Sequence, residues 1–177
     1  MRNGVEHVVK WKRWFNLLMA LLLVSAIIPP GFARTAKASE GLQNLALFQP
    51  YFHSYPHNPM AQYDDRNGVE LTDGMYAARG SDDPAWQGRL LAAGDSFALT
   101  INLRRVSQIF ELSIRFMQDE KQGIHYPGHV SFSYSLDGIY YTELGDAVYR
   151  QVTDQVREYS LTLPTAVDAL YVRAGID

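Results

Sequence analysis

The sequence predicts an all-β fold, a single β-sandwich domain that follows an N-terminal export signal. Two observations predict the sandwich. Large apolar residues recur at every second position in several segments, which places one face of a strand on a core and the other in water. Turn-forming residues separate these segments, and helical periodicity is nearly absent. Several short strands with turn signals between them are typical of a sandwich or barrel.

Five segments carry the alternation. In residues 97–103 and 130–134, every second residue is large and apolar, and serines alternate with Val130, Phe132 and Tyr134. The stretch 110–116 follows the same rule, and 159–163 and 170–174 make a fourth and a fifth strand. The residues of 110–116 expected to face the core are Phe110, Leu112, Ile114 and Phe116.

The segments between the expected strands differ in character. Ser135-Leu136-Asp137-Gly138 followed by Tyr140-Tyr141 predicts a hairpin, because Asp-Gly readily supplies the positive φ of a tight turn. Residues 50–96 are rich in Pro, Gly, Asp, Asn and aromatic residues and have little periodicity. A long ordered loop of this kind often carries function on a rigid scaffold.

The N-terminus predicts export. A basic stretch at residues 10–13 precedes an apolar run at 15–28, and the Pro-Pro-Gly sequence 29–31 ends the helical potential. Ala36-Lys37-Ala38 has the small-x-small pattern of a signal-peptidase site, so residues 1–38 are expected to be removed before Ser39. The alternative is a retained anchor, but a spanning helix needs roughly 20 apolar residues. A lipoprotein is excluded because the chain has no cysteine.

Export changes the charge of the protein. The chain has 16 basic and 19 acidic residues, and removing six basic residues and one acidic residue with the signal leaves 10 and 18, a formal charge of −8. Nucleic acid and anionic membrane are poor partners for such a surface, so we expect contact with a membrane only during export. Without cysteine, residues 39–177 must be held together by packing, or by packing and a metal ion.

The order of several short motifs resembles the discoidin-like domains, also called coagulation factor V/VIII type C domains. This group includes the family 32 carbohydrate-binding modules of bacterial secreted enzymes. The resemblance covers about residues 41–177. Its motifs are Asn44-Leu45-Ala46, Glu70-Leu71-Thr72-Asp73-Gly74, Trp86-Gln87-Gly88, Thr100-Ile101-Asn102-Leu103, Gly123-Ile124 with Pro127, the stretch 130–138, and Leu170-Tyr171-Val172-Arg173.

The resemblance implies a jelly-roll β-sandwich of the galactose-binding-domain type, with about eight strands and a ligand site in the loops at one end. Family members continue after the strand that contains Leu170–Arg173 into a last strand. This chain ends at Asp177. We therefore expect the final strand to be lacking, either because the chain is a fragment of a longer protein or because the gene is truncated.

The resemblance also implies a structural calcium ion near the first loops. In the family, the aspartate of the Leu-Thr-Asp-Gly segment is a usual ligand, which here is Asp73, and Ser81 and Asp82 are candidates for completing the site. Calcium prefers hard oxygen ligands in a flexible cage. The alternative is that Asp73 merely caps a turn.

A sugar site needs aromatic faces that stack on pyranose rings and polar groups that bond the hydroxyls. The loop that begins at Tyr51 and its neighbours have this composition, although Trp86 can equally belong to the core. The family's binding residues vary from member to member. The candidate ligand-binding residues are Tyr51, Phe52, His53, Tyr55, His57, Tyr76, Arg79 and Trp86.

The sequence contains no recognisable active site. The acidic pairs Asp64-Asp65, Asp82-Asp83 and Asp119-Glu120 are interpreted as solvated loop charges, because neighbours in an extended chain point in opposite directions. The leading hypothesis is a monomeric, secreted, non-catalytic carbohydrate-binding module for a cell-wall or environmental glycan. The alternative is an accessory domain of a larger secreted glycoside hydrolase-like or adhesion protein, with no activity of its own.

Overall fold

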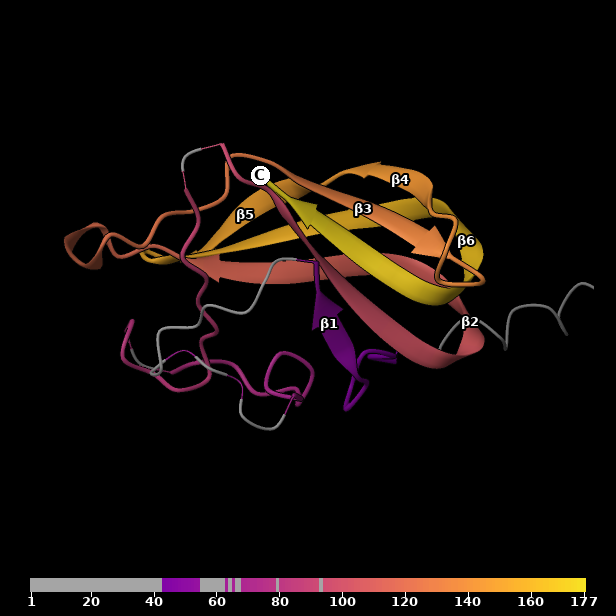
Figure 1. Ribbon diagram of the computed structural model, residues 1–177, viewed down its shortest axis with the longest axis horizontal. Helices are drawn as coiled ribbons and strands as arrows, with labels where there is room; N and C mark the ends of the chain where they lie inside the picture. Colours follow the sequence, from indigo (N-terminus) through magenta and orange to yellow (C-terminus); the bar gives the residue numbers. More distant parts are fainter. Residues whose placement is uncertain (1–42, 55–62, 64, 66–67, 79, 93) are drawn as a thin grey trace, which may run out of the picture. The chain divides into compact units, whose positions relative to one another are not determined.

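The computed structural model describes residues 43–54, 63, 65, 68–78, 80–92 and 94–177 (Figure 1). The chain divides into two compact units, Met1–Gln43 and Asn44–Asp177, and the second holds every element described below. The predicted export signal and the candidate ligand residues Tyr55, His57 and Arg79 lie outside the described residues.

The unit is built from strands, as the sequence predicts. All strand pairs are antiparallel, the sheet order is β1-β2-β6-β3-β4, and β5 pairs with β6 beside this path. Among the described residues, no helix is long and apolar enough to cross a membrane. The elements are β1 (Tyr51–His53), β2 (Phe97–Met117), the 3-10 helix η3 (Glu120–Gln122), β3 (Val130–Ser135), β4 (Thr142–Asp146), β5 (Val148–Thr153) and β6 (Val156–Ile176).

Two long strands connect two layers. β2 and β6 have 21 residues each and pair with each other on both sides of a register break between Asn102 and Ser107. The part of β2 before the break also pairs with β1, and its partner segment at the end of β6 pairs with β3. The first part of β6, which pairs with β2 after the break, pairs with β5. Figure 1 shows both strands turning back at the same end, at the right of the view. Strands that pass from one layer to the other in this way make the corner of a sandwich.

The core contains the apolar residues that the period-two alternation predicts for three segments. Leu99 and Leu103 of β2 are buried, as are Val130 and Phe132 of β3 and Tyr159 of β6. The partly buried side chains Phe97, Ile101, Tyr134 and Leu161 pack against them. The predicted all-β fold is therefore confirmed, but the alternate face of these strands is not left in water, because Thr100 and Ser133 are buried as well.

One inward-facing residue was predicted wrongly. Phe110 was expected to face the core, but its side chain is 45% exposed, while Ile109 is buried. The β2–β6 register shifts between Ile109 and Glu111, and Leu112 is buried again beyond this point. An extra residue in one strand reverses the alternation, so a strict period of two fails at a bulge.

The predicted hairpin connects β3 to β4. One oxygen of Asp137 accepts hydrogen bonds from the backbone N–H groups of Ile139 and Tyr140 at 2.8 and 2.9 Å, and also from the Ser135 hydroxyl at 2.9 Å. These bonds, led by the one from Tyr140, hold the pKa of Asp137 below its usual range. Gly138 has φ = 77°, the left-handed conformation that the Asp-Gly pair predicts.

The described part of the loop region 50–96 contains little regular structure apart from β1, and side chains bond its backbone. The buried Thr72 hydroxyl donates to the carbonyl oxygens of Gln49 and Val69. The buried Asp83 carboxylate accepts from the N–H groups of Ala78 and Ala85, both at 3.0 Å. These side-chain hydrogen bonds satisfy backbone N–H and C=O groups that have no partner strand to bond.

Candidate functional site

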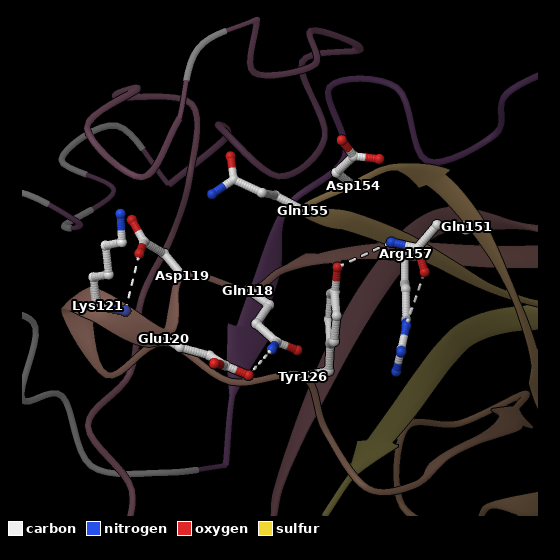
Figure 2. Close-up of a pocket in the computed structure, with 9 residues that line it drawn as sticks. All are labelled: Gln118, Asp119, Glu120, Lys121, Tyr126, Gln151, Asp154, Gln155 and Arg157. Carbon is white, nitrogen blue, oxygen red and sulfur yellow. Dashed lines mark hydrogen bonds between the residues drawn. The ribbon is translucent and has the colours of Figure 1, made fainter.

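A cleft of about 670 Å³ opens where β2 ends and β6 begins (Figure 2). One wall is formed by Gln118, Asp119, Glu120 and Lys121 together with Tyr126, which follow β2. The other wall comes from the end of β5, the turn after it and the start of β6, and consists of Gln151, Asp154, Gln155 and Arg157. Eight of the nine lining side chains carry an amide or charged group that can form hydrogen bonds, and the ninth is a tyrosine.

The first wall is shaped by a short helical turn. The Asp119 carboxylate accepts a hydrogen bond from the backbone N–H of Lys121 at 3.2 Å, which caps η3 at its start. Gly123 ends the turn with φ = 71°, and Asp119 and Ile124 exchange two backbone hydrogen bonds. The chain therefore reverses within a few residues after β2 and presents its polar side chains to the cleft.

Arg157 is held between two aromatic rings. Its guanidinium carbon lies 4.2 Å from the ring centroid of Tyr126 and 4.4 Å from that of Tyr149. Its Nε donates to the side-chain oxygen of Gln151 at 3.1 Å, and the Gln151 amide donates to the Tyr126 hydroxyl at 3.3 Å (Figure 2). Cation–π contacts and this amide bridge fix Tyr126 and Arg157 relative to each other.

The segment that carries Tyr126 is attached to the sandwich at its far end. The hydroxyl of the buried Tyr159 donates to the carbonyl oxygen of Pro127 at 3.0 Å. The ring of His129 lies between two carboxylates, with Nε2 at 2.9 Å from Asp146 and Nδ1 at 3.3 Å from Asp177. The hydrogen bond to Asp146, and then that to Asp177, raises the pKa of His129.

The three carboxylates of the cleft differ in what they bind. Asp119 accepts from the Ser81 hydroxyl at 2.7 Å as well as from the backbone of Lys121. Glu120 accepts from the Gln118 amide at 2.7 Å. Asp154 is exposed and has no hydrogen-bond or ion-pair partner among the residues that the structure describes.

An ion-pair row lies beside the cleft, on the outer face of the same layer. Glu158 of β6 is buried between Arg115 of β2 at 2.7 Å and Arg150 of β5 at 2.6 Å. Burial raises the pKa of Glu158, but the hydrogen bonds and charges of the two arginines outweigh it and leave this pKa below its usual value. The Arg115 guanidinium also lies 3.7 Å from the ring centroid of Tyr76.

The structure does not bring the predicted ligand residues together in this cleft. Tyr51, Phe52 and His53 form β1, which pairs with the Leu99–Ile101 part of β2 in the other layer. Tyr76 covers Arg115 on the outer face, and Trp86 is partly buried, with an indole nitrogen that has no hydrogen-bond partner in the described part of the chain. None of these five described residues lines the cleft.

The predicted calcium ligands each occupy a loop position. Asp73 accepts from the N–H of Met75 at 2.7 Å, as a turn cap does, and Ser81 donates to Asp119. Asp82 is exposed. Within the described residues, no group of three or more His, Cys, Asp or Glu side chains is placed to hold a metal ion. Calcium stays a prediction, and an ion here would depend on backbone carbonyl oxygens.

The cleft was not predicted from the sequence. Asp119-Glu120 was interpreted as solvated loop charge, and Tyr126 and Arg157 were given no role. The available signal was a run of five polar residues, 118–122, directly after a strand and four residues before a tyrosine. The opposite wall had no such signal, because it comes from a segment about 30 residues later in the chain.

Comparison with known proteins found no matching family model and no matching curated protein. Among solved structures, the module CpGH89CBM32-6 produced by Clostridium perfringens shares 17% identity at a TM-score of 0.45, over 76% of this chain and 88% of that one. Chitosan-binding module 1 of a chitosanase/glucanase from Paenibacillus sp. IK-5 shares 15% identity at a TM-score of 0.47, over 76% and 86%. CBM32-1 from a family 31 glycoside hydrolase of C. perfringens shares 12% at 0.41, over 73% and 84%. These neighbours are of the kind that the sequence resemblance indicated.

Proposed function

We propose that the chain is a carbohydrate-binding domain and that its ligand site is the cleft between residues 118–126 and 151–157. The observation that supports this most strongly is a fixed tyrosine surrounded by amide and charged side chains. Figure 2 shows Arg157 on one side of the Tyr126 ring and Gln118 and Glu120 toward the other. A pyranose ring stacks on the free face, and its hydroxyls bond the surrounding polar groups.

We further propose that the domain has no catalytic activity. A glycosidase needs a carboxylic acid with a raised pKa that faces a second carboxylate across the cleft. In the part of the chain that the structure describes, Glu158 is a buried carboxylate, but the two arginines beside it lower its pKa. Glu120 and Asp154, which line the cleft, are exposed.

The proposal includes export, with a cell-wall or environmental glycan as the target. Its support is the basic, apolar and small-residue order of the first 38 residues. Mass spectrometry of the protein recovered outside an exporting host tests this. We expect a mass that lacks residues 1–38, and an intact N-terminus would contradict cleavage.

Binding is tested by affinity electrophoresis in gels that contain soluble polysaccharides, with the wild type beside Tyr126→Ala. We expect at least one glycan to retard the wild type and to retard Tyr126→Ala far less, because the variant lacks the stacking face. The matched control is Tyr140→Ala, which removes a tyrosine that is 80% exposed on the β3–β4 hairpin. Equal retardation of all three proteins, or retardation by no glycan, would overturn the proposal.

A further inference from the structure

We propose that two copies of the chain associate through the free edge of β2, by pairing residues 111–115 of one copy antiparallel with the same residues of the other. The partner is thus a second copy of this chain, in place of the monomer expected from the sequence. The proposal depends on an unpaired strand edge whose side chains match themselves when the strand is reversed about Ser113.

The second half of β2 forms the border of its layer. From Glu111 to Met117 it pairs with β6 on one side, and β5 lies beyond β6. In the part of the chain that the structure describes, no strand pairs with the other side of this segment, because β1 pairs only with Leu99–Ile101. Figure 1 shows this part of β2 below β6 and β5. Such an edge leaves backbone N–H and C=O groups unpaired and can template another strand.

The charges on this edge are complementary to each other, whereas natural proteins usually place charges on an edge to repel a second strand. In an antiparallel pair centred on Ser113, Glu111 of one copy lies opposite Arg115 of the other, and two-fold symmetry makes this pair twice. A shift by one residue turns the faces over, and a shift by two removes both charge pairs. The charges therefore select one register.

Both charged side chains are available for such a pair. Glu111 is exposed and has no hydrogen-bond or ion-pair partner among the described residues. The side chain of Arg115 is 24% exposed, and the ring of Tyr76 holds its guanidinium flat at 3.7 Å. Arg115 donates from Nε to Glu158 at 2.7 Å, but a guanidinium has five N–H donors and retains some for a second carboxylate.

The second copy continues a row of ion pairs that crosses the sheet. Arg150 of β5, Glu158 of β6 and Arg115 of β2 lie opposite one another in register. Glu158 accepts from both arginines, so the row has two positive charges and one negative. Glu111 of the second copy, opposite Arg115, is the next member and makes the row neutral. This continuation favours a second copy over an unrelated strand.

The inner face of the edge also matches itself. In the same register Leu112 of one copy lies opposite Ile114 of the other. Ile114 and Phe116 are only partly buried where they pack against the core, and Phe110, next to this stretch, is 45% exposed. A second copy covers this apolar surface with apolar side chains of its own, which adds to the backbone hydrogen bonds.

Pairing at this edge sets the distance between the two clefts. β2 ends at Met117, and the cleft begins at Gln118. In an antiparallel pair centred on Ser113 the two strand ends point in opposite directions, roughly 33 Å apart at the usual rise of a strand. One polysaccharide chain can then engage both clefts, which raises the apparent affinity. This consequence rests on the proposed function, whereas the association itself does not.

The test is sedimentation velocity of the purified protein over a range of concentrations. We expect the mass of the wild type to rise from one chain towards two, because a short strand edge gives a weak dimer. Glu111→Arg sets like charges opposite Arg115 twice, so we expect self-association to be at least about tenfold weaker. Glu143→Arg, the same change at an exposed glutamate of β4, is the matched control and should behave like the wild type.

A charge-swapped mixture tests the register. Arg115→Glu alone should also lose self-association, and its equimolar mixture with Glu111→Arg should recover it, because unlike charges then lie opposite each other in both pairs. A mixture of folded variants that stays monomeric would overturn the proposal. If melting curves show that Arg115→Glu is unfolded, the comparison of Glu111→Arg with Glu143→Arg decides alone.

Two other results would also overturn the proposal. One is a wild type with the mass of a single chain at every concentration, and the other is equal self-association of Glu111→Arg and the wild type. No glycan is present in these measurements, so a negative result leaves the proposed function standing.

Discussion

Glu158 connects three strands through one carboxylate, with Arg115 of β2 on one oxygen and Arg150 of β5 on the other. We expect Glu158→Gln to lower the free energy of unfolding at neutral pH by about 1–2 kcal/mol, because two charge-assisted hydrogen bonds weaken. The two arginines hold the pKa of Glu158 lower in the folded state than in the unfolded state. The stabilisation is therefore complete above the unfolded-state pKa of Glu158, and it is lost as the pH falls through the folded-state pKa. Urea titrations of the two proteins should therefore differ at pH 7, and the difference should shrink as the pH is lowered below the unfolded pKa of about 4.3.

The opposite pH dependence is expected at His129. Its pKa is raised in the folded state by Asp146 and Asp177, so the stabilisation is complete below the unfolded pKa of about 6.5 and is lost as the pH rises through the folded value. Thermal melts of the wild type and His129→Asn should differ more at pH 5.5 than at pH 8.5. His125→Asn, a change at an exposed histidine in the same loop, is the control. A pH-independent difference would show that His129 acts only by packing.

At the scale of single elements, the β3–β4 hairpin depends on Gly138. Its φ of 77° is strained for other residues, and an added Cβ would lie 3.0 Å from the ring of Tyr171. We expect Gly138→Ala to cost about 1–3 kcal/mol of stability, measured by urea unfolding. Gly128→Ala is the matched control. A Cβ added at Gly128 would have a backbone oxygen as its nearest neighbour, at 3.8 Å, which is an ordinary van der Waals contact. Equal losses in the two variants would contradict the role of the turn.

The strands that could be predicted were those with one buried face. Alternation located the strand segments of β2, β3 and β6, and Asp137-Gly138 located the hairpin. β5 gave no signal because most of its residues are exposed, and no periodicity shows the bulge at Ile109 or the continuity of each long strand across both layers. The cleft was not predicted for a related reason. Tyr126 and Arg157 come from separate segments, and only the β2–β6 pairing brings them together.

At the scale of the whole molecule, the predicted calcium ion would stabilise the folded chain as a ligand that binds only the native state. If calcium is bound, adding a chelator should lower the melting temperature by roughly 5–10 °C when the ion was a hundredfold above its Kd. Asp73→Asn should then melt at the lower temperature with or without chelator. An unchanged melting curve of the wild type would show that Asp73 only caps the turn, as its bond to Met75 indicates.

The central claim is that a glycan binds the cleft at the end of β2 and β6, and not the aromatic strand β1 that the composition favoured. The most direct measurement is a 1H–15N NMR titration with the glycan that binds best. The account predicts that shift changes cluster at residues 118–126 and 151–157, including the side-chain amides of Gln118, Gln151 and Gln155. Changes centred on Tyr51–His53, or no changes with any glycan, would contradict it.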